Sequence, residues 1–180
     1  MEDAATIIVR PARDEDASAV ARVYIESWHD TYAGILPTKL LCAMTMRGQT
    51  ARWQSAIRAR NREHVLVAEA GQHGVIGMVS FGATRDACGY DSEVYTLYVD
   101  PMFYGQGAGR ALLNGAFAVL REKGFSSCIV WAHARNNARF FYEALGGKLV
   151  AERAVKMMGD AVEEIAFGWR MLAIAERSAP

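Results

Sequence analysis

A glycine-rich stretch between an apolar run and a helical pattern constrains the fold of this chain more than any other feature. The run from Val94 to Val99, within SEVYTLYVD, is apolar at nearly every position, which is typical of a central strand covered on both faces. The stretch PMFYGQGAGRALL, residues 101–113, follows it with glycine at alternate positions from Gly105 to Gly109. Glycine lets a backbone turn tightly or approach a ligand closely. The segment is therefore either an anion-binding loop before a helix or a tight turn packed on the core.

Two standard phosphate-binding motifs are excluded by counting residues in this stretch. A dinucleotide-binding fingerprint requires GxGxxG, but counting from Gly105 places Arg110 at the third glycine, and counting from Gly107 places Leu112 there. A Walker A loop requires GK followed by serine or threonine, which the stretch lacks. A strand, a glycine loop and a helix still direct backbone N–H groups and the positive end of the helix dipole outward together. The stretch alone leaves an anion site and an empty turn both open.

Apolar periodicity predicts one mixed domain around this stretch. The predicted strands are residues 5–12, 63–70, 74–84, 92–100, 127–133, 148–157 and 162–172. The predicted helices are residues 17–28, a short one after Pro37, 50–60, 109–123 and 138–145. This pattern indicates an α/β or α+β fold with a single mixed, mostly antiparallel central sheet and helices on both faces. Without internal repeats or low-complexity linkers, residues 1–180 are expected to form a single domain with its core in residues 7–172.

Composition and charge narrow the classes of partner. Twenty basic and twenty acidic residues give a formal net charge of zero, so no overall field favours nucleic acid or an anionic membrane. No apolar run approaches the ~18 residues that a membrane-spanning helix needs, and the acidic N-terminus has no signal-peptide pattern. Three widely spaced cysteines are typical of reduced thiols in the cytoplasm. The four histidines form no HxH or HxxxH pattern, so no metal is expected.

Two motifs in register give the chain a resemblance to a known family. LYVDP is followed by GQGAGRALL, then by a predicted strand, then by NNARFFYEALGG, and this order resembles the GNAT superfamily of acyl-CoA-dependent N-acetyltransferases. The family loop is commonly written [QR]-x-x-G-x-[GA], and Tyr104, Gly107 and Gly109 occupy its three defined places. Tyr104 departs from the usual glutamine or arginine. The second motif is met by Asn136, Ala138, Arg139, Phe141, Tyr142, Glu143, Leu145, Gly146 and Gly147.

The resemblance implies how acetyl-CoA, the acyl donor, would bind. The strand edge at Leu97, Tyr98 and Val99 would pair with the pantetheine arm, and a backbone N–H near Val99 would stabilise the oxyanion. Asn136 would contact the pantetheine or serve only as a helix cap. The amides of the glycine loop would hold the pyrophosphate, and the loop residues are Tyr104, Gly105, Gln106, Gly107, Ala108, Gly109 and Arg110.

The resemblance also implies roles in proton transfer. Tyr142 lies in the position of the family's general acid, where a phenol protonates the leaving thiolate; the other interpretation is a half-buried aromatic residue. Glu93, at the start of the central strand, is the first candidate for the base, acting directly or through a water, unless it is a solvated strand-end carboxylate. His133 is the second candidate and a candidate acceptor contact, although a lone histidine is often structural.

The acceptor would be bound by the first predicted helix and the loop after it. ESWHDTYAGILP offers Glu26, Trp28, Asp30 and Tyr32, and aromatic rings beside carboxylates suit a cationic amine. Trp28 also lies on the core stripe of that helix, which allows a packing role.

The leading hypothesis is an N-acetyltransferase that moves acetyl from acetyl-CoA to a primary amine of a small molecule or peptide, by direct attack in a ternary complex. The alternatives are a non-catalytic acyl-CoA sensor or assembly module, and a nucleotide-phosphate binder, which the missing lysine disfavours. A homodimer would follow if an exposed final strand paired with its copy.

Overall fold

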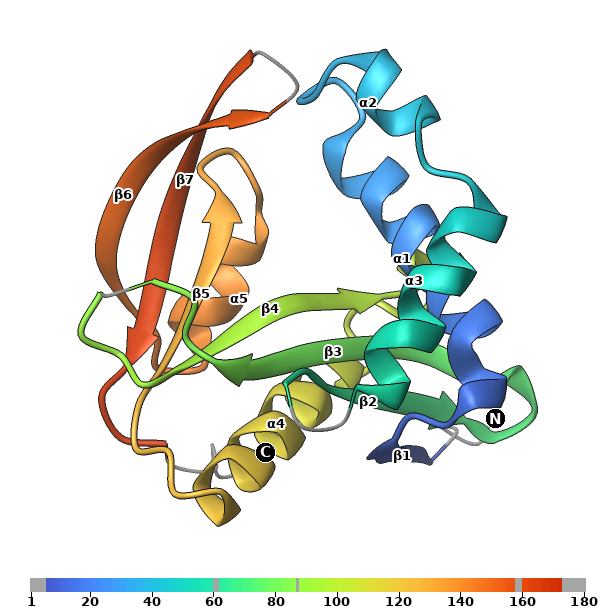
Figure 1. Ribbon diagram of the computed structural model, residues 1–180, viewed down its shortest axis with the longest axis horizontal. Coiled ribbons are helices and arrows are strands. Elements are labelled where there is room, and N and C mark those ends of the chain that lie inside the picture. The colour runs from blue at the N-terminus through green and yellow to red at the C-terminus, as the bar shows by residue number, and fades with distance from the viewer. Residues whose placement is uncertain (1–5, 60–61, 87, 158–159, 173–180) are drawn as a thin grey trace. The chain divides into compact units, whose positions relative to one another are not determined.

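The computed structural model describes residues 6–172 except 60–61, 87 and 158–159 (Figure 1). Its helices and strands follow one another in nearly the predicted order. They are β1 (Ile7–Pro11), α1 (Ala17–Tyr32), α2 (Thr38–Cys42), α3 (Met46–Arg58), β2 (His64–Ala70), β3 (Val75–Ala83), β4 (Ser92–Val99), α4 (Ala108–Glu122), β5 (Cys128–His133), α5 (Ala138–Ala144), β6 (Lys148–Met157) and β7 (Asp160–Trp169). No helix among the described residues is long and apolar enough to cross a bilayer.

The strands form one seven-stranded sheet in the order β1-β2-β3-β4-β5-β7-β6. The pairs β1–β2, β2–β3, β5–β7 and β6–β7 are antiparallel, whereas β4 and β5 are parallel. The β4–β5 register covers Ser92 to Val94 and does not continue along the rest of β4. The predicted mixed, mostly antiparallel sheet is confirmed.

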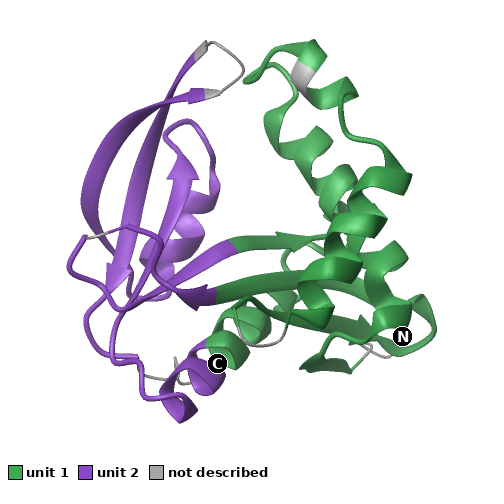
Figure 2. Ribbon diagram, in the orientation of Figure 1, with its two compact units in different colours: residues 1–81, 96–116 green, residues 82–95, 117–180 purple. Residues whose placement is uncertain are grey.

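The chain divides into two compact units, which are coloured separately in Figure 2. Unit 1 comprises residues 1–81 and 96–116, and unit 2 comprises residues 82–95 and 117–180. The boundary therefore crosses β3, β4 and α4. The expectation of a single domain with its core in residues 7–172 stays a prediction.

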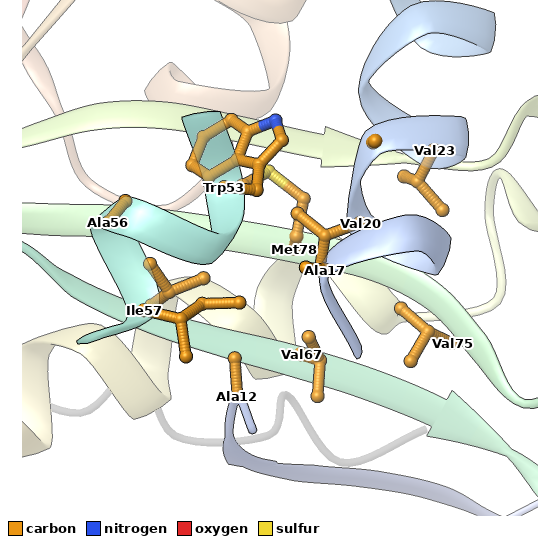
Figure 3. Close-up of a cluster of buried hydrophobic side chains, with 12 residues drawn as sticks. Ala12, Ala17, Val20, Val23, Trp53, Ala56, Ile57, Val67, Val75 and Met78 are labelled. Atoms are coloured by element: carbon orange, nitrogen blue, oxygen red, sulfur yellow. The ribbon is translucent and has the colours of Figure 1, made fainter. Parts of the chain in front are cut away.

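In unit 1, helices cover both faces of the sheet. On one face, α1 and α3 contribute Val20 and Trp53 to a core that also contains Val67 and Met78 from the strands (Figure 3). On the other face α4 packs so closely that a Cβ on its Gly115 would lie 3.1 Å from side chains of β1 and β2. The predicted two-sided arrangement is confirmed for this unit, because apolar side chains alternate between the faces of each strand.

In unit 2, aromatic side chains of α5 and β7 pack against one another. The Tyr142 ring lies 5.8 Å from that of Phe167 and 6.1 Å from that of Trp169, between centroids. The indole Nε1–H of Trp169 donates to the backbone carbonyl of Leu145 at 2.9 Å, which holds the end of α5 on the sheet.

Two predicted boundaries and one burial pattern were wrong. The helix expected over 50–60 begins at Met46, because the Thr45 side chain caps it by accepting from the Gly48 N–H at 3.1 Å. The last strand ends at Trp169 instead of residue 172. Within β4 the middle residues, Tyr95 to Tyr98, are only half-buried, so the strand is not covered on both faces along its whole length.

In unit 2, the carboxylate of Asp91 holds the two residues immediately before β5 in place. Asp91 accepts the backbone N–H and hydroxyl of Ser126 at 2.8 Å each, and those of Ser127 at 2.9 and 2.8 Å. Desolvation by burial acts to raise the pKa of Asp91, but these hydrogen bonds outweigh it and lower the pKa to about 2. The carboxylate therefore stabilises the fold in its ionised form.

We expect Asp91→Asn to reduce the free energy of unfolding at neutral pH by about 1–2 kcal/mol, a figure discounted for solvent exposure. Because the folded-state pKa lies below the unfolded value, this contribution is complete above the unfolded pKa and is lost as the pH falls through about 2. Urea unfolding at neutral pH and at stepwise lower pH measures both effects. Glu152→Gln, at an exposed position on β6, is the control. A deficit that stayed constant on acidification would contradict the assignment.

Candidate active site

The loop between β4 and α4 turns through two left-handed glycines. Asp100 ends the strand, and its carboxylate accepts the Met102 N–H at 3.0 Å, which starts a short 3-10 turn. Gly105 then has φ +77° and Gly107 φ +90°, a region that side chains with a Cβ rarely adopt. These turns deliver the chain to Ala108, the first residue of α4.

The start of α4 presents backbone donors before its first internal hydrogen bond. That bond runs from the Ala111 N–H to the Gly107 carbonyl, 3.0 Å apart. The N–H groups of the preceding residues, Ala108 to Arg110, therefore lie in the first turn, where the helix dipole favours an anion. Gly109 lies within this turn, and the Gln106 amide is held locally by the Met102 carbonyl at 3.4 Å. An anion-binding loop fits this geometry.

Side chains of α1 form hydrogen bonds and an ion pair with residues at the end of β4. The buried Ser27 hydroxyl donates to the Val99 carbonyl at 2.8 Å. The guanidinium of Arg22 reaches Asp100 at 2.9 Å and the Val75 carbonyl at 2.9 Å. Neither Ser27 nor Arg22 was a predicted site residue, and no motif in the sequence singles them out.

The side chain of Tyr104 turns toward the end of α1. Its phenol is near enough to Thr31 and Asp30 for both side chains to affect its pKa, and about half of the residue, 51 %, is exposed. Desolvation by burial, together with the nearby charge of Asp30, raises the pKa of Tyr104. The residue that replaces the family's glutamine or arginine therefore joins the loop to α1.

Five aromatic rings form a cluster within unit 1, here called the aromatic wall: Tyr24, Trp28, Tyr32, Trp53 and Tyr98. The Tyr24 ring is central, since its centroid lies 5.4 Å from that of Trp53, 5.3 Å from that of Tyr98 and 6.4 Å from that of Trp28. The Trp28 and Tyr32 rings are 4.8 Å apart. The structure thus brings the two predicted acceptor aromatics together with the strand that ends at the glycine loop.

The third predicted acceptor residue, Glu26, is engaged with its own helix. Its carboxylate pairs with Arg22 at 2.8 Å. Because Arg22 also holds Asp100, Glu26 belongs to the group that fastens β4, and its contact with an acceptor stays a prediction.

In unit 2, Glu93 is buried and not solvated, with 1 % of the residue exposed. Its Oε2 accepts from the backbone N–H of Arg85 at 3.0 Å and from Nε at 3.2 Å, and its Oε1 accepts from Nη2. The Arg85 guanidinium also stacks 4.4 Å from the centroid of the Tyr95 ring. Arg85 is a partner that sequence reasoning missed, because it lies in the turn between β3 and β4 without any motif.

The other predicted residues of unit 2 have defined surroundings. Tyr142 is buried in the α5–β7 packing. Asn136 accepts the Ala138 N–H at 2.8 Å through its side-chain oxygen, in a local turn that precedes α5, whose N-cap residue is Asn137. His133 accepts the Arg135 N–H at its Nδ1, 3.0 Å away, and its pKa is lowered by burial and by the charge of Arg135, against Glu164 and Glu163.

The predicted site residues thus form two groups. The glycine loop, the end of β4 and the aromatic wall lie in unit 1, whereas Glu93, His133, Asn136 and Tyr142 lie in unit 2. Among the described residues, no group of three His, Cys, Asp or Glu side chains could hold a metal ion.

Comparison with known proteins identifies the family. The model of the acetyltransferase (GNAT) family matches residues 19–147, which include both motifs. The uncharacterised N-acetyltransferase YuaI of Bacillus subtilis (strain 168) is 35 % identical over 164 residues, covering 91 % of this chain and 92 % of that protein.

Solved structures share the fold at lower identity. The PaiA N-acetyltransferase of Thermoplasma acidophilum, in complex with coenzyme A, superimposes with a TM-score of 0.69 at 22 % identity, covering 89 % of this chain and 98 % of that chain. YncA of Salmonella typhimurium, solved with its cofactor acetyl-CoA, gives a TM-score of 0.67 at 23 % identity, covering 97 % of this chain and 98 % of that chain. Sequence motifs, family match and fold agree: the chain belongs to the GNAT family of acetyltransferases.

Proposed function

We propose that this acetyltransferase transfers the acetyl group of acetyl-CoA to a primary amine of a small molecule or peptide, by direct attack in a ternary complex. The observation that carries the proposal is the loop of unit 1, in which Gly105 and Gly107 adopt left-handed conformations directly before the first turn of α4. Such a loop receives a pyrophosphate through backbone N–H groups without needing a particular side chain. This explains how Tyr104 can replace the family's glutamine or arginine.

The residues present fit acetyl-CoA along the loop and the adjacent strand. Gly105 to Arg110 would hold the pyrophosphate, and Leu97 and Tyr98 would guide the pantetheine arm along the edge of β4. The Val99 carbonyl accepts from Ser27, which keeps the strand end in place, and a backbone N–H near Val99 would stabilise the oxyanion. When bound, acetyl-CoA supplies a thioester, an acyl group already activated toward amines.

Two groups of unit 2 would move the protons. The acceptor amine must lose a proton before it attacks, and Glu93 is the proposed destination through a water. Both lone pairs of Oε2 are occupied by Arg85, whereas Oε1 has one acceptance from Arg85 and room for another. The Tyr142 hydroxyl would return a proton to the thiolate of coenzyme A as the carbon–sulfur bond breaks. His133 and Asn136 stay secondary contacts of the acceptor and the pantetheine.

A thermal-shift and turnover screen tests the proposed function. We expect coenzyme A to raise the melting temperature of the protein, and acetyl-CoA with at least one amine of a panel to release free thiol. Polyamines, amino acids, aminoglycosides and peptide amines should be included. Stabilisation by coenzyme A without thiol release on any amine would overturn catalysis in favour of a sensor, and no stabilisation at millimolar coenzyme A would overturn the binding site as well.

The three free cysteines support a cytoplasmic location for this activity.

We expect Gly107→Ala to raise the KM for acetyl-CoA about tenfold. A Cβ at Gly107 would meet no atom within 4 Å, so the effect would come from the φ of +90° and not from a clash. Steady-state kinetics with acetyl-CoA varied measures it. Gly124→Ala, also at a left-handed glycine (φ +89°) with open space around it but at the end of α4, is the matched control. Equal KM values for the two variants would contradict a cofactor role for the loop.

A further inference from the structure

Arg52 on α3 carries a guanidinium without a carboxylate partner. The group lies 4.5 Å from the centroid of the Trp53 ring and 5.6 Å from that of Tyr24, so it stacks on the aromatic wall. No ion pair to Arg52 is found in the part of the chain that the structure describes.

A second donor at the same place also lacks an acceptor. Trp53 is fully buried, and its indole Nε1 is one of the few buried side-chain atoms in the described residues that have no hydrogen-bond partner. Figure 3 shows this nitrogen on the edge of the ring that is turned away from Ile57 and Ala56, the aliphatic side chains of the same helix. A buried N–H without a partner is unusual and requires an explanation.

Most of the polar groups gathered here are donors; the exception is Gln49 on the same helix, whose buried Oε1 is an acceptor without a partner among the described residues. A guanidinium and an indole N–H have no acceptor capacity, and a phenol can donate as well. Burial raises the pKa of Tyr24, and the positive charge of Arg52 acts in the opposite direction. A site of this composition favours an anion over a cation, and the forked N–H edge of an arginine stacked by its face matches a carboxylate.

We propose that Arg52, stacked on the aromatic wall, binds the carboxylate of the acceptor, so that the preferred acceptor is an amine that also bears a carboxylate, such as an amino acid. The inference rests on the proposed function, which it makes more specific. Arg52 is thus a specificity-determining residue, and the buried Trp53 ring supports its guanidinium.

The proposed carboxylate contact is linked to β4 by one aromatic ring. All of the residues involved lie in unit 1, and Tyr24 lies between Arg52 and β4. The centroid of its ring is 5.6 Å from the guanidinium and 5.3 Å from the ring of Tyr98, the strand residue proposed to guide the pantetheine. An amino acid held by its carboxylate at Arg52 can extend along the Tyr24 ring toward β4.

The test compares acceptors that differ only in the carboxylate. Each amino acid is assayed with its carboxamide and with the amine left after decarboxylation, at saturating acetyl-CoA. The wild-type enzyme is expected to prefer the amino acid. Arg52→Gln is expected to raise the KM for that acceptor about tenfold and to leave kcat, the KM for acetyl-CoA and the KM for the two analogues without a carboxylate within about twofold. Arg52→Lys keeps the charge but not the fork, so an intermediate KM is expected.

Arg47→Gln, an exposed arginine on the same helix, is the matched control and should change none of these constants. Equal use of amino acid, amide and amine by the wild type would overturn the inference while leaving acetyl transfer established. A rise in the KM for acetyl-CoA in Arg52→Gln would assign the arginine to the donor and also overturn it. Absence of transfer to every amine would overturn the proposed function, and the inference with it.

Discussion

Tyr142→Phe is expected to lower kcat about a hundredfold while acetyl-CoA binds with unchanged affinity. The ring of Tyr142 packs against Phe167 and Trp169, and phenylalanine preserves that packing. The substitution removes only the hydroxyl, the proposed source of the proton for the leaving thiolate. Single-turnover kinetics and calorimetric titration with coenzyme A separate the chemical step from binding. Alkaline pH should not rescue the variant, because the missing group is an acid.

A tyrosine elsewhere in unit 2 provides the control for this prediction. Tyr90 is buried to the same degree as Tyr142, with 6 % and 5 % of the residues exposed, and it packs in the cluster with Ile129 and Ala166. Tyr90→Phe removes a buried hydroxyl outside the second motif and should leave kcat nearly unchanged. If the two variants lost activity equally, Tyr142 would be a packing residue and not the acid.

Glu93→Gln is expected to reduce kcat at neutral pH by a similar factor, about a hundredfold. Glutamine fills the same space but accepts a proton poorly, so a water at Oε1 can no longer pass the proton of the amine to it. The deficit should narrow at high pH, where the acceptor amine is already neutral. A pH–rate profile of the wild type and the variant, from neutral to alkaline pH, measures this difference.

Arg85→Gln separates proton transfer from loss of the ion pair. It breaks the same contact and leaves the Glu93 carboxylate in place, and Arg85 is solvated, with 61 % of its side chain exposed. A loss of kcat well below that of Glu93→Gln is therefore expected. Equal losses in the two variants, independent of pH, would show that Glu93 only positions the turn between β3 and β4, and the base would then be sought elsewhere.

The sequence predicted the fold best where a residue pattern reports directly on backbone conformation. Alternating apolar residues predicted the strands closely, and left-handed glycines marked the loop before α4. The start of α3 was missed because Met46 is the sole apolar side chain in the first turn after Thr45, so periodicity gives no signal there and only the cap reveals the boundary. Burial along β4 was overestimated because apolar composition does not show which residues a partner strand covers.

Within the site, predictable residues were those that belong to motifs. The glycine loop and Tyr142 followed from the family pattern, and the family itself is confirmed. The contacts of Ser27 with Val99 and of Arg85 with Glu93 join residues from different elements. The stacking of Arg52 on Tyr24 does the same. Such pairings depend on tertiary packing, which spacing along one chain does not encode. Tyr104 shows the same limit, since its interaction with Thr31 and Asp30 is invisible in the motif that it breaks.

Different residues of helix α1 hold the end of β4 and form the aromatic wall. Arg22 and Ser27 secure the strand that leads to the glycine loop, whereas Tyr24, Trp28 and Tyr32, spaced one turn apart, build the aromatic wall. The proposed acceptor contacts can therefore change while the proposed donor site is kept. For directed evolution, the same separation defines a compact library: positions 28, 32 and 52 can be randomised while positions 22 and 27 are kept constant.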